Sequence, residues 1–585
     1  MTSTPPDAAR TTGRRPRFEW IPGLTAAATY KPAYLPRDLV AGIVLTTLLV
    51  PQGMAYAELA GLPAITGLYT SILCLLAYAV FGPSKVLVLG PDSSLGPMIA
   101  AVVIPMVASG GDPQKAVALA SVMALLVGAF MTIAAVAKLG FVADLLSHPT
   151  QLGYMNGLAL TILIGQLPKL FGFSVDADGL FAEAGAFVAG VAGGRTVPAA
   201  LLVGVGGLVV IAGLRRWLPK VPGILIAVVL AILAVAVFGL EERGVDLVGP
   251  LPQGFPPFTI PSVSWSELGL LAAGALGITL VSVTDTISTA SAFAARSGQE
   301  VRGNQEMAGI GAANLAAGLF QGFPVSTSGS RTAVAFQAGA RTQMTGLVGA
   351  AAITLMLVLV PGLLRDLPQP MLAAVVIAAS LSLADVPGMV RLWRQRRVEF
   401  SLAVAAFLGV AILGVLPGIA FAVALSVLNV FRRTWWPYRT TLGRAEGING
   451  FHDVREHPEA ELLPGLVLFR FDAPLIFANS RSFRQEIRHL ANADPAPTWI
   501  VVAAEPITDV DTTAADMLQE LDAELDAEGV SLVFAEMKSP VREKLDRYKL
   551  TGKIEAAHFF PTIDDAVAAY RHRTGTDWSH PPRVL

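Results

Sequence analysis

Apolar stretches of helical length alternate with short polar turns from about residue 38 to residue 432. A helix needs about 20 mainly apolar residues to cross a bilayer. The first group of expected membrane elements lies at 38–59, 64–82, 92–109, 114–138, 144–172, 197–216 and 222–239. The second group lies at 265–294, 304–321, 326–337, 343–362, 369–384, 397–414 and 415–431. The pattern predicts an α-helical polytopic membrane protein with about seven elements in each half.

The third element of each half is short and begins with a proline followed by small hydroxyl residues, as GPDSS at 90–94 and FPVSTSGSR at 323–331. Irregular polar backbone at membrane depth is tolerated only where it is buried in protein or lines a cavity. An odd number of elements per half makes the second half enter from the opposite side, which indicates an inverted repeat. Two half-length helices would then direct their N-terminal N–H groups at a common spot, which favours an anion.

The pattern changes to that of a soluble α/β domain from about residue 440. Runs at 466–471, 499–503 and 530–535 predict buried strands, and amphipathic stretches at 480–492 and 513–528 predict the helices between them. Alternation of this kind predicts a mostly parallel core sheet covered by helices.

The expected organisation follows from these patterns and from the basic residues that flank the spans. Arginines before the first span and after the last one place both ends of the chain in the cytosol, because cytoplasmic loops carry the excess of basic residues. The divisions are an N-terminal segment at 1–37, a first transmembrane repeat at 38–240, a connection at 241–264, a second repeat at 265–432, a linker at 433–460, the α/β domain at 461–572 and a tail at 573–585.

Composition narrows the class of function. Of the 585 residues, 53% are hydrophobic and 15% are charged, and the net charge of −2 excludes a broadly basic nucleic-acid binder. The single cysteine, Cys74, lies in an apolar run, so neither a disulfide framework nor a cysteine metal site is expected. The sequence contains no nucleophile–base set, zinc spacing or phosphate-binding loop, which predicts that the chain is not an enzyme and has no cofactor.

Several separate motifs resemble the sulfate permease (SulP) family of anion transporters, and the resemblance covers nearly the whole chain. They are PQGMAYA at 51–57, GLPAITGLY at 61–69, GPDS at 90–93, HPTQLGYMNG at 148–157, GQL at 165–167, NQEMAG at 304–309 with Asn314, and FPVSTSGSRT at 323–332. The resemblance implies about fourteen membrane segments in two inverted repeats, with a core bundle against a gate bundle. It also implies a C-terminal STAS domain, as in anti-sigma-factor antagonists, and a homodimer.

The candidate anion-binding residues centre on Arg331, a permanent charge inside a span. It binds an oxyanion or holds the cavity positive, or else it forms a structural ion pair with a carboxylate in the membrane. Family relatives with this arginine place it by the anion site. The candidate hydroxyl donors are Ser328 and Ser330 on one half-helix and Ser93 and Ser94 on the other.

Two further residues, Gln52 and Tyr56 on the first span, complete the candidate substrate site. Gln52 and Tyr56 lie one helical turn apart on the first span, so both can face the cavity, although Tyr56 alone also suits core packing. Asp92 is unfavourable beside a dianion, and it is either protonated or a cap for its own helix.

The candidate coupling residue is Asp285 in the eighth span, with Thr289 one turn away. These two match sodium-binding positions of a bicarbonate-transporting family member, but Thr327 and Gly329 depart from that pattern, so a proton is favoured over sodium. Asp285 neutralising Arg331 is the alternative. In the α/β domain, Thr512 and Thr513 match the loop where anti-sigma antagonists present a phosphorylatable residue, although either threonine also suits a simple helix cap.

The predicted function is secondary active transport of a small anion across the cytoplasmic membrane by alternating access, coupled to H+ or Na+. The expected substrate is a sulfate-class oxyanion or bicarbonate, held between the third and tenth elements. A C4-dicarboxylate symporter and an uncoupled anion channel or exchanger of the same fold are the alternatives. The expected partners are the anion, the lipid bilayer and a second copy of the chain, with no nucleic acid.

Overall fold

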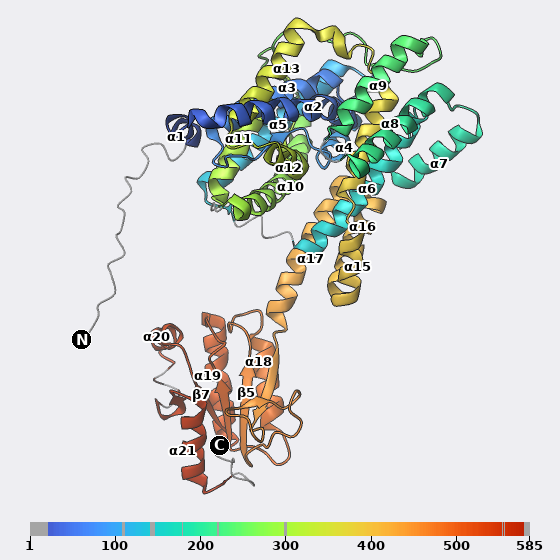
Figure 1. The fold of residues 1–585 in the computed structure, drawn as a ribbon. Helices are drawn as coiled ribbons and strands as arrows, with labels where there is room; N and C mark the ends of the chain where they lie inside the picture. The colour runs from blue at the N-terminus through green and yellow to red at the C-terminus, as the bar shows by residue number, and fades with distance from the viewer. Residues whose placement is uncertain are drawn as a thin grey trace. The chain divides into compact units, whose positions relative to one another are not determined.

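The structure is a computed structural model that describes residues 21–107, 111–140, 147–177, 179–218, 221–297, 301–550, 552, 554 and 556–577 (Figure 1). The chain divides into two compact units, Met1–Ser426 and Val427–Leu585, which are considered separately.

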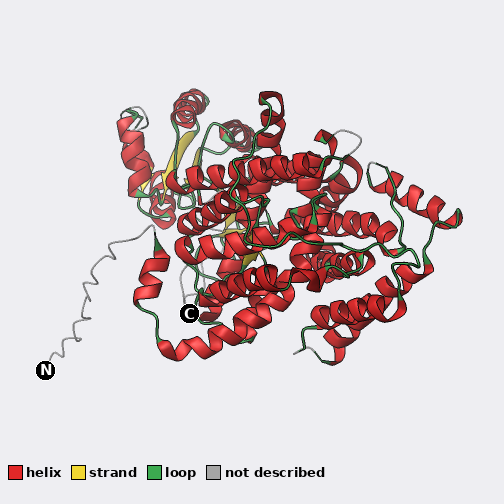
Figure 2. Ribbon diagram, turned by 90° about the horizontal axis from the view of Figure 1, so that it is seen from above, coloured by secondary structure: helices red, strands yellow, loops and turns green. Residues whose placement is uncertain are grey.

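The first unit is almost entirely helical (Figure 2). Its first half contains α1 (Pro22–Ala28), α2 (Leu35–Leu59), α3 (Ala64–Phe81), β1 (Leu89–Gly90), α4 (Gly96–Met106), α5 (Pro113–Val136), α6 (His148–Leu170), α7 (Leu180–Ala192), α8 (Pro198–Trp217) and α9 (Gly223–Phe238). Its second half contains α10 (Trp265–Ser297), α11 (Gly303–Leu319), β2 (Ser326–Thr327), α12 (Gly329–Gln337), α13 (Met344–Leu359), α14 (Gln369–Leu383), α15 (Val386–Gln395), α16 (Arg397–Leu413) and α17 (Val415–Trp435).

Each of the fourteen expected membrane elements contains one helix of the described chain. Among the described residues, seven helices are both long and apolar enough to cross a bilayer. The third element of each half, α4 or α12, is a short helix preceded by extended backbone. The fold is therefore the expected inverted repeat of seven elements and seven.

Besides α1, which precedes the first expected element, the described helices α7 and α15 lie outside the expected membrane elements. The sequence analysis left 180–192 and 386–395 without a helix. At 13 and 10 residues, both helices are too short to give the signal of a membrane-crossing segment.

The helices of the first unit form two bundles. In one, α11 packs on α5 and α3, and α13 packs on α2 and α3. In the other, α14 and α16 pack on α6, and α14 also packs on α8. The first corresponds to the core bundle and the second to the gate bundle. The two bundles meet where α2 contacts α14 and α9.

The second unit contains a six-stranded sheet in the order β4-β3-β5-β6-β7-β8. The strands are β3 (Arg439–Gly443), β4 (His452–Asp453), β5 (Leu466–Phe471), β6 (Trp499–Ala503), β7 (Ser531–Ala535) and β8 (Phe559–Phe560), and the helices are α18 (Ser480–Ala491), α19 (Thr512–Ala527), α20 (Ser539–Arg547) and α21 (Ile563–Thr574). Strands β5 to β8 are parallel, as expected for the core, and β3 pairs antiparallel with β4 and β5.

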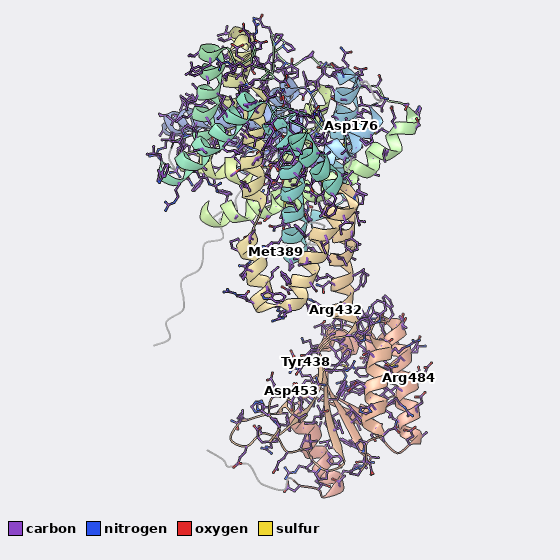
Figure 3. The ribbon with its side chains drawn as sticks, turned by 90° about the vertical axis from the view of Figure 1, so that its right-hand side faces the viewer. Asp176, Met389, Arg432, Tyr438, Asp453 and Arg484 are labelled. Carbon is purple, nitrogen blue, oxygen red and sulfur yellow. The ribbon has the colours of Figure 1, made fainter. Side chains whose placement is uncertain are left out.

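Side-chain hydrogen bonds hold β4, the edge strand of this sheet, in place. Figure 3 shows Tyr438 and Asp453 side by side, where the tyrosine hydroxyl donates a hydrogen bond to the carboxylate. The other carboxylate oxygen of Asp453 accepts from Thr440 Oγ1 at 2.6 Å. Apolar side chains pack on both faces of the sheet in two clusters, so this unit has its own core.

Candidate functional site

The two half-helices meet through a short antiparallel pair of strands. Leu89 of β1 lies opposite Thr327 of β2, and Gly90 lies opposite Ser326. The pairing continues beyond the strands, because the Ser328 amide donates to the Val88 carbonyl at 3.1 Å. Strands β1 and β2 lead toward α4 and α12 respectively, so the pairing brings the N-terminal ends of both half-helices together.

Buried side-chain amides hold the extended segments in place. Asn314 of α11 accepts from the Val325 amide at 2.9 Å and donates to the Val325 carbonyl at 3.3 Å. Gln343, which precedes α13, donates to the carbonyls of Ser84 and Leu87 at 2.8 and 2.9 Å. The backbone of each segment that precedes a half-helix is therefore bonded by a side-chain amide from elsewhere in the chain, which meets the requirement for polar backbone inside a membrane protein.

A cavity of about 1290 Å³ lies where the half-helices meet. All eleven membrane residues that the sequence analysis selected line it, namely Gln52, Tyr56, Ser93, Ser94, Asp285, Thr289, Thr327, Ser328, Gly329, Ser330 and Arg331. Gly329 and Ser330 are the most open of the half-helix group, whereas Ser93, Ser94 and Thr327 are buried. The sequence analysis missed the lining residues from the second bundle, among them Gln151, Met155 and Arg215.

Arg331 is only 1% exposed and lies behind the backbone of the β1 segment. One of its terminal nitrogens donates to the Pro91 carbonyl at 2.5 Å, and the other lies 3.8 Å from the Asp92 carboxylate. A Cβ on Gly90 would come within 3.3 Å of the guanidinium, so glycine leaves the room that this arrangement needs. Among the described residues, Nε and Nη2 of Arg331 have no hydrogen-bond acceptor.

The two carboxylate oxygens of Asp92 contact different neighbours, Ser94 and Arg331. Its Oδ1 accepts from the amide and the hydroxyl of Ser94 at 3.0 and 2.8 Å, while Oδ2 faces Arg331. The contact with Ser94 lies in the turn before α4, and the N-terminal position of the helix itself, Leu95, has no side-chain cap. The ion pair of Arg331 is therefore with Asp92 rather than with Asp285, the partner weighed before.

Asp285 lies on α10 between the two bundles. Its carboxylate accepts from Ser94 Oγ at 3.4 Å and from Nε2 of Gln151 at 3.3 Å. Gln151 is on α6 of the gate bundle, and no sequence signal connects it to residue 285. Nearby, Thr327 Oγ1 donates to Thr286 Oγ1 at 3.0 Å, which ties β2 to α10.

The candidate coupling residues gather around this carboxylate. Thr289 is one turn from Asp285, and its hydroxyl lies 3.8 Å from where a Cβ of Gly329 would be. The group offers a carboxylate and hydroxyl oxygens, the ligands of hard cations and of a proton. Among the described residues, no three His, Cys, Asp or Glu side chains are grouped as a metal centre.

The cavity extends to one face of the membrane unit. Its outer part is lined by Val40 at the start of α2, by Gln337 at the end of α12, and by Ser382 and Leu383 at the end of α14. Alternating helix directions place these ends on the face where α2 begins. Near the opposite face, Gln369 at the start of α14 donates to Glu58 at the end of α2 at 2.8 Å, which joins the two bundles there.

Glu306, in the first turn of α11, bonds side chains of neighbouring segments. Its carboxylate accepts from the Tyr78 hydroxyl at 2.6 Å and from Ser84 Oγ, so it joins α11 to α3 and to the segment before α4. A carboxylate in a first helical turn gives the same sequence signal whether it caps its own helix or bonds a neighbouring one.

In the second unit, Thr512 and Thr513 are exposed in the first turn of α19. The cap of this helix is Asp511, whose carboxylate accepts from the Ala514 amide at 2.8 Å, so neither threonine has that role. On the same loop, the Lys544 ammonium bonds Asp509 at 2.5 Å and lowers the pKa of that carboxyl.

Comparison with protein families matches residues 35–406 to the sulfate permease family and residues 457–566 to the STAS domain. A probable sulfate transporter of Mycobacterium tuberculosis is 42% identical over 95% of this chain and 98% of its own length. Sulfate transporter 1.1 of Arabidopsis thaliana is 28% identical over 91% of this chain and 85% of its own length.

Solved structures show the same architecture at low identity. Murine Solute Carrier 26 family member A9, described as an anion transporter in the inward-facing state, superposes with a TM-score of 0.86 at 23% identity, over 97% of this chain and 96% of its own. The transmembrane domain of a cyanobacterial bicarbonate transporter gives 0.58 at 20% identity, over 68% of this chain and 98% of its own.

Proposed function

The chain belongs to the sulfate permease family, and from this premise we propose that it moves a small oxyanion, sulfate first among the candidates, across the cytoplasmic membrane by secondary active transport. It is a multi-pass membrane transporter rather than an enzyme, as its relatives are. The mycobacterial and plant relatives named as sulfate transporters support sulfate as the first substrate to test.

One observation carries the proposal: two half-helix N-termini, four serine hydroxyls and a buried arginine converge on a single cavity. Ser93 and Ser94 come from one half-helix segment, and Ser328 and Ser330 from the other. Free N–H groups and the positive ends of helix dipoles favour an anion, and hydroxyls donate to its oxygens. The proposed binding position lies between these four serines, with Arg331 supplying positive potential through the thin wall of the β1 segment.

The balance of charge suggests how transport is coupled. The inner end of the cavity is lined by one cation, Arg331, and by two carboxylates, Asp92 and Asp285. A dianion entering beside two ionised carboxylates meets strong repulsion, which a proton or a sodium ion on Asp285 would relieve. The carboxylate of Asp92 already faces Arg331 and accepts two hydrogen bonds from Ser94. We therefore assign the coupling cation to Asp285. The surrounding residues are Thr289, Thr327 and Gly329.

The same geometry supports alternating access. The cavity reaches the face where α2 begins, which the positive-inside rule assigns to the cytoplasm. On the other face, Gln369 and Glu58 join the two bundles. The proposed conformation is inward-open, and release of this contact would accompany opening to the outside.

The test is uptake into proteoliposomes that contain the purified chain. Radiolabelled sulfate, bicarbonate and fumarate are supplied separately, each with no gradient, with an inward pH gradient and with an inward sodium gradient. Sulfate accumulation above equilibrium under one gradient supports the proposal. Accumulation of fumarate alone would replace it with dicarboxylate symport, and equilibration without accumulation under either gradient would indicate a channel or an exchanger.

The coupling assignment has its own prediction. Asp285→Asn keeps the size of the side chain and removes its ionisable oxygen, so concentrative uptake should fall to the equilibrium level while exchange of internal for external sulfate continues. Thr284→Val, one residue away on a side chain that bonds only its own helix backbone, is the matched control. Gradient-driven accumulation by Asp285→Asn would remove the coupling role from this residue.

A further inference from the structure

The helix α15 lies at a membrane face between two helices of the gate bundle. It starts three residues after the end of α14 and finishes two residues before α16 begins. Leu392 and Gly388 form its buried side, and α15 packs beside α6 and α16 (Figure 1). Its other sides are exposed, and they present one apolar strip and one basic strip.

One open strip is apolar and the next is basic. Val386, Val390 and Trp393 are 61%, 44% and 47% exposed, and helical spacing places them along one line. Arg391 and Arg394 follow around the helix on the side next to Val390. A groove of about 500 Å³ runs between the two strips, lined by Val386, Pro387, Val390, Arg391, Arg394 and Gln395.

The two arginines of the groove lack protein counter-charges. Neither Arg391 nor Arg394 has an acidic partner among the residues that the structure describes. The nearby acids are engaged elsewhere, because Asp385 caps the helix through the Gly388 amide at 2.8 Å and Glu399 lies 3.3 Å from Arg396. Arg397 lies over the Trp393 ring at 4.4 Å, so a third cation borders the apolar strip.

We propose that this groove binds the headgroup of an anionic phospholipid in the cytoplasmic leaflet. A helix that lies in the interface, with an apolar strip toward the acyl chains and arginines toward the headgroups, is attracted to anionic lipid by both contacts. Arginine suits a phosphate because its planar fork donates two parallel hydrogen bonds. The cluster of arginines also assigns this face to the cytoplasm, where anionic lipids are exposed to it.

The position of the groove connects it to the cavity. Ser382 and Leu383, which line the outer part of the cavity, are followed almost directly by α15. Gly388 approaches α6 so closely that a Cβ there would lie 2.7 Å from a methyl of Leu152, the neighbour of Gln151. A bound lipid would therefore hold α15 against the turn of α6 that contacts Asp285.

The experiment measures lipid binding to the full-length protein in detergent by native mass spectrometry. Dioleoyl phosphatidylglycerol and dioleoyl phosphatidylcholine are titrated against the wild type, Arg391→Gln/Arg394→Gln, and Arg243→Gln/Arg365→Gln. The last variant removes the same two charges from loops on the other face. Each basic residue contributes about 1 kcal/mol to the attraction of anionic lipid, so Arg391→Gln/Arg394→Gln should bind phosphatidylglycerol about 30-fold more weakly than the wild type.

The control variant should bind phosphatidylglycerol as the wild type does, and Arg391→Lys/Arg394→Lys should retain most of the binding. Equal phosphatidylglycerol affinity in wild type and Arg391→Gln/Arg394→Gln would overturn the proposal. So would displacement of the lipid by inorganic phosphate at the same concentration, because that result would identify a free-anion site. If Arg391→Gln/Arg394→Gln no longer elutes as a single species in size-exclusion chromatography, Arg391→Lys/Arg394→Lys decides the question. Failure of the lysine variant to bind phosphatidylglycerol would also contradict the proposal.

Discussion

In the proposed mechanism, Arg331 would act on the cavity as a buried source of charge. Its guanidinium is fixed by the Pro91 carbonyl and by Asp92, and little of it reaches open space. A charge in this position lowers the energy of an anion through the protein without a direct bond, and its effect is strong because the surroundings have a low dielectric constant. The serines would then provide the direct contacts.

Replacing Arg331 by alanine should reduce sulfate uptake to near background. The change leaves Asp92 and Asp285 as the only charges at the inner end of the cavity, and it unpairs Asp92 inside the membrane. Initial uptake rates in proteoliposomes measure the effect, and size-exclusion profiles in detergent report the fold. Arg365→Ala, on an exposed loop, is the control. Normal uptake by Arg331→Ala would sink the assignment of the site.

Asp92→Asn should have the opposite effect to Arg331→Ala and improve the binding of sulfate. The amide oxygen can still accept from Ser94, while the negative charge beside Arg331 disappears. The cavity becomes more positive, so the KM for sulfate should decrease several-fold in uptake measured against sulfate concentration. Ser94→Ala, which removes the hydroxyl contact to Asp92 but keeps the amide contact and the charge, serves as comparison. An increased KM in Asp92→Asn would show that the carboxylate positions the half-helix rather than opposing the anion.

The membrane candidates could be selected from sequence because polar residues are rare inside apolar spans. A hydroxyl run after a proline at membrane depth has few explanations, and the candidates selected from the two runs line the cavity. Pairings were not predictable in the same way. Whether Arg331 contacts Asp92 or Asp285 depends on how two distant segments pack, and Gln151 has a polar side chain near a helix start, where polar residues are common.

At the scale of elements, helices α2 and α3 cross at their backbones. A Cβ on Gly67 would lie 1.9 Å from the Gly53 carbonyl oxygen, closer than any real contact. Gly53 neighbours Gln52, which lines the cavity, so the crossing positions one wall of the site.

Gly67→Ala should force α2 and α3 apart and lower the stability by about 1–3 kcal/mol, the usual cost of overpacking. The midpoint of thermal unfolding in detergent measures this loss. Gly206→Ala on α8 is the matched control, because a Cβ there meets no atom within 4 Å. A midpoint for Gly67→Ala equal to that of Gly206→Ala would contradict the close crossing.

Element prediction succeeded for the membrane-crossing helices and for strands β5, β6 and β7, and it missed β3, β4, β8, α20 and α21. Continuous apolar sequence predicts the membrane-crossing helices. Runs of β-branched and aromatic residues predict strands β5, β6 and β7. Strands β4 and β8 have two residues each, too few for a period to be visible. Whether a two-residue segment becomes a strand depends on a partner elsewhere in the chain.

At the scale of the whole molecule, the two units have separate apolar cores. The clusters of the α/β unit share no residue with those of the membrane unit. A fragment of residues 437–577 should therefore be soluble and fold independently, with cooperative thermal unfolding and a near-ultraviolet signal from Trp499, which is buried among Phe560 and Tyr570. A fragment that lacks this signal would show that the sheet needs the membrane unit to form.

The homodimer implied by the family resemblance stays a prediction. Mass photometry of the detergent-purified chain, corrected for bound detergent, would report one protein copy or two.

The strand pair that joins Leu89 to Thr327 and Gly90 to Ser326 has a consequence for how the protein is made. Its two members come from opposite halves of the chain, and the β1 segment reaches the ribosome exit long before its partner exists. Until then, polar backbone of the first half is without its final partners in the bilayer, where each unsatisfied group costs several kcal/mol. Neither half can build the cavity alone, so we expect completion of the cavity to be a late step of biogenesis. A chain that stops early would carry unpaired strand backbone for membrane quality control to recognise.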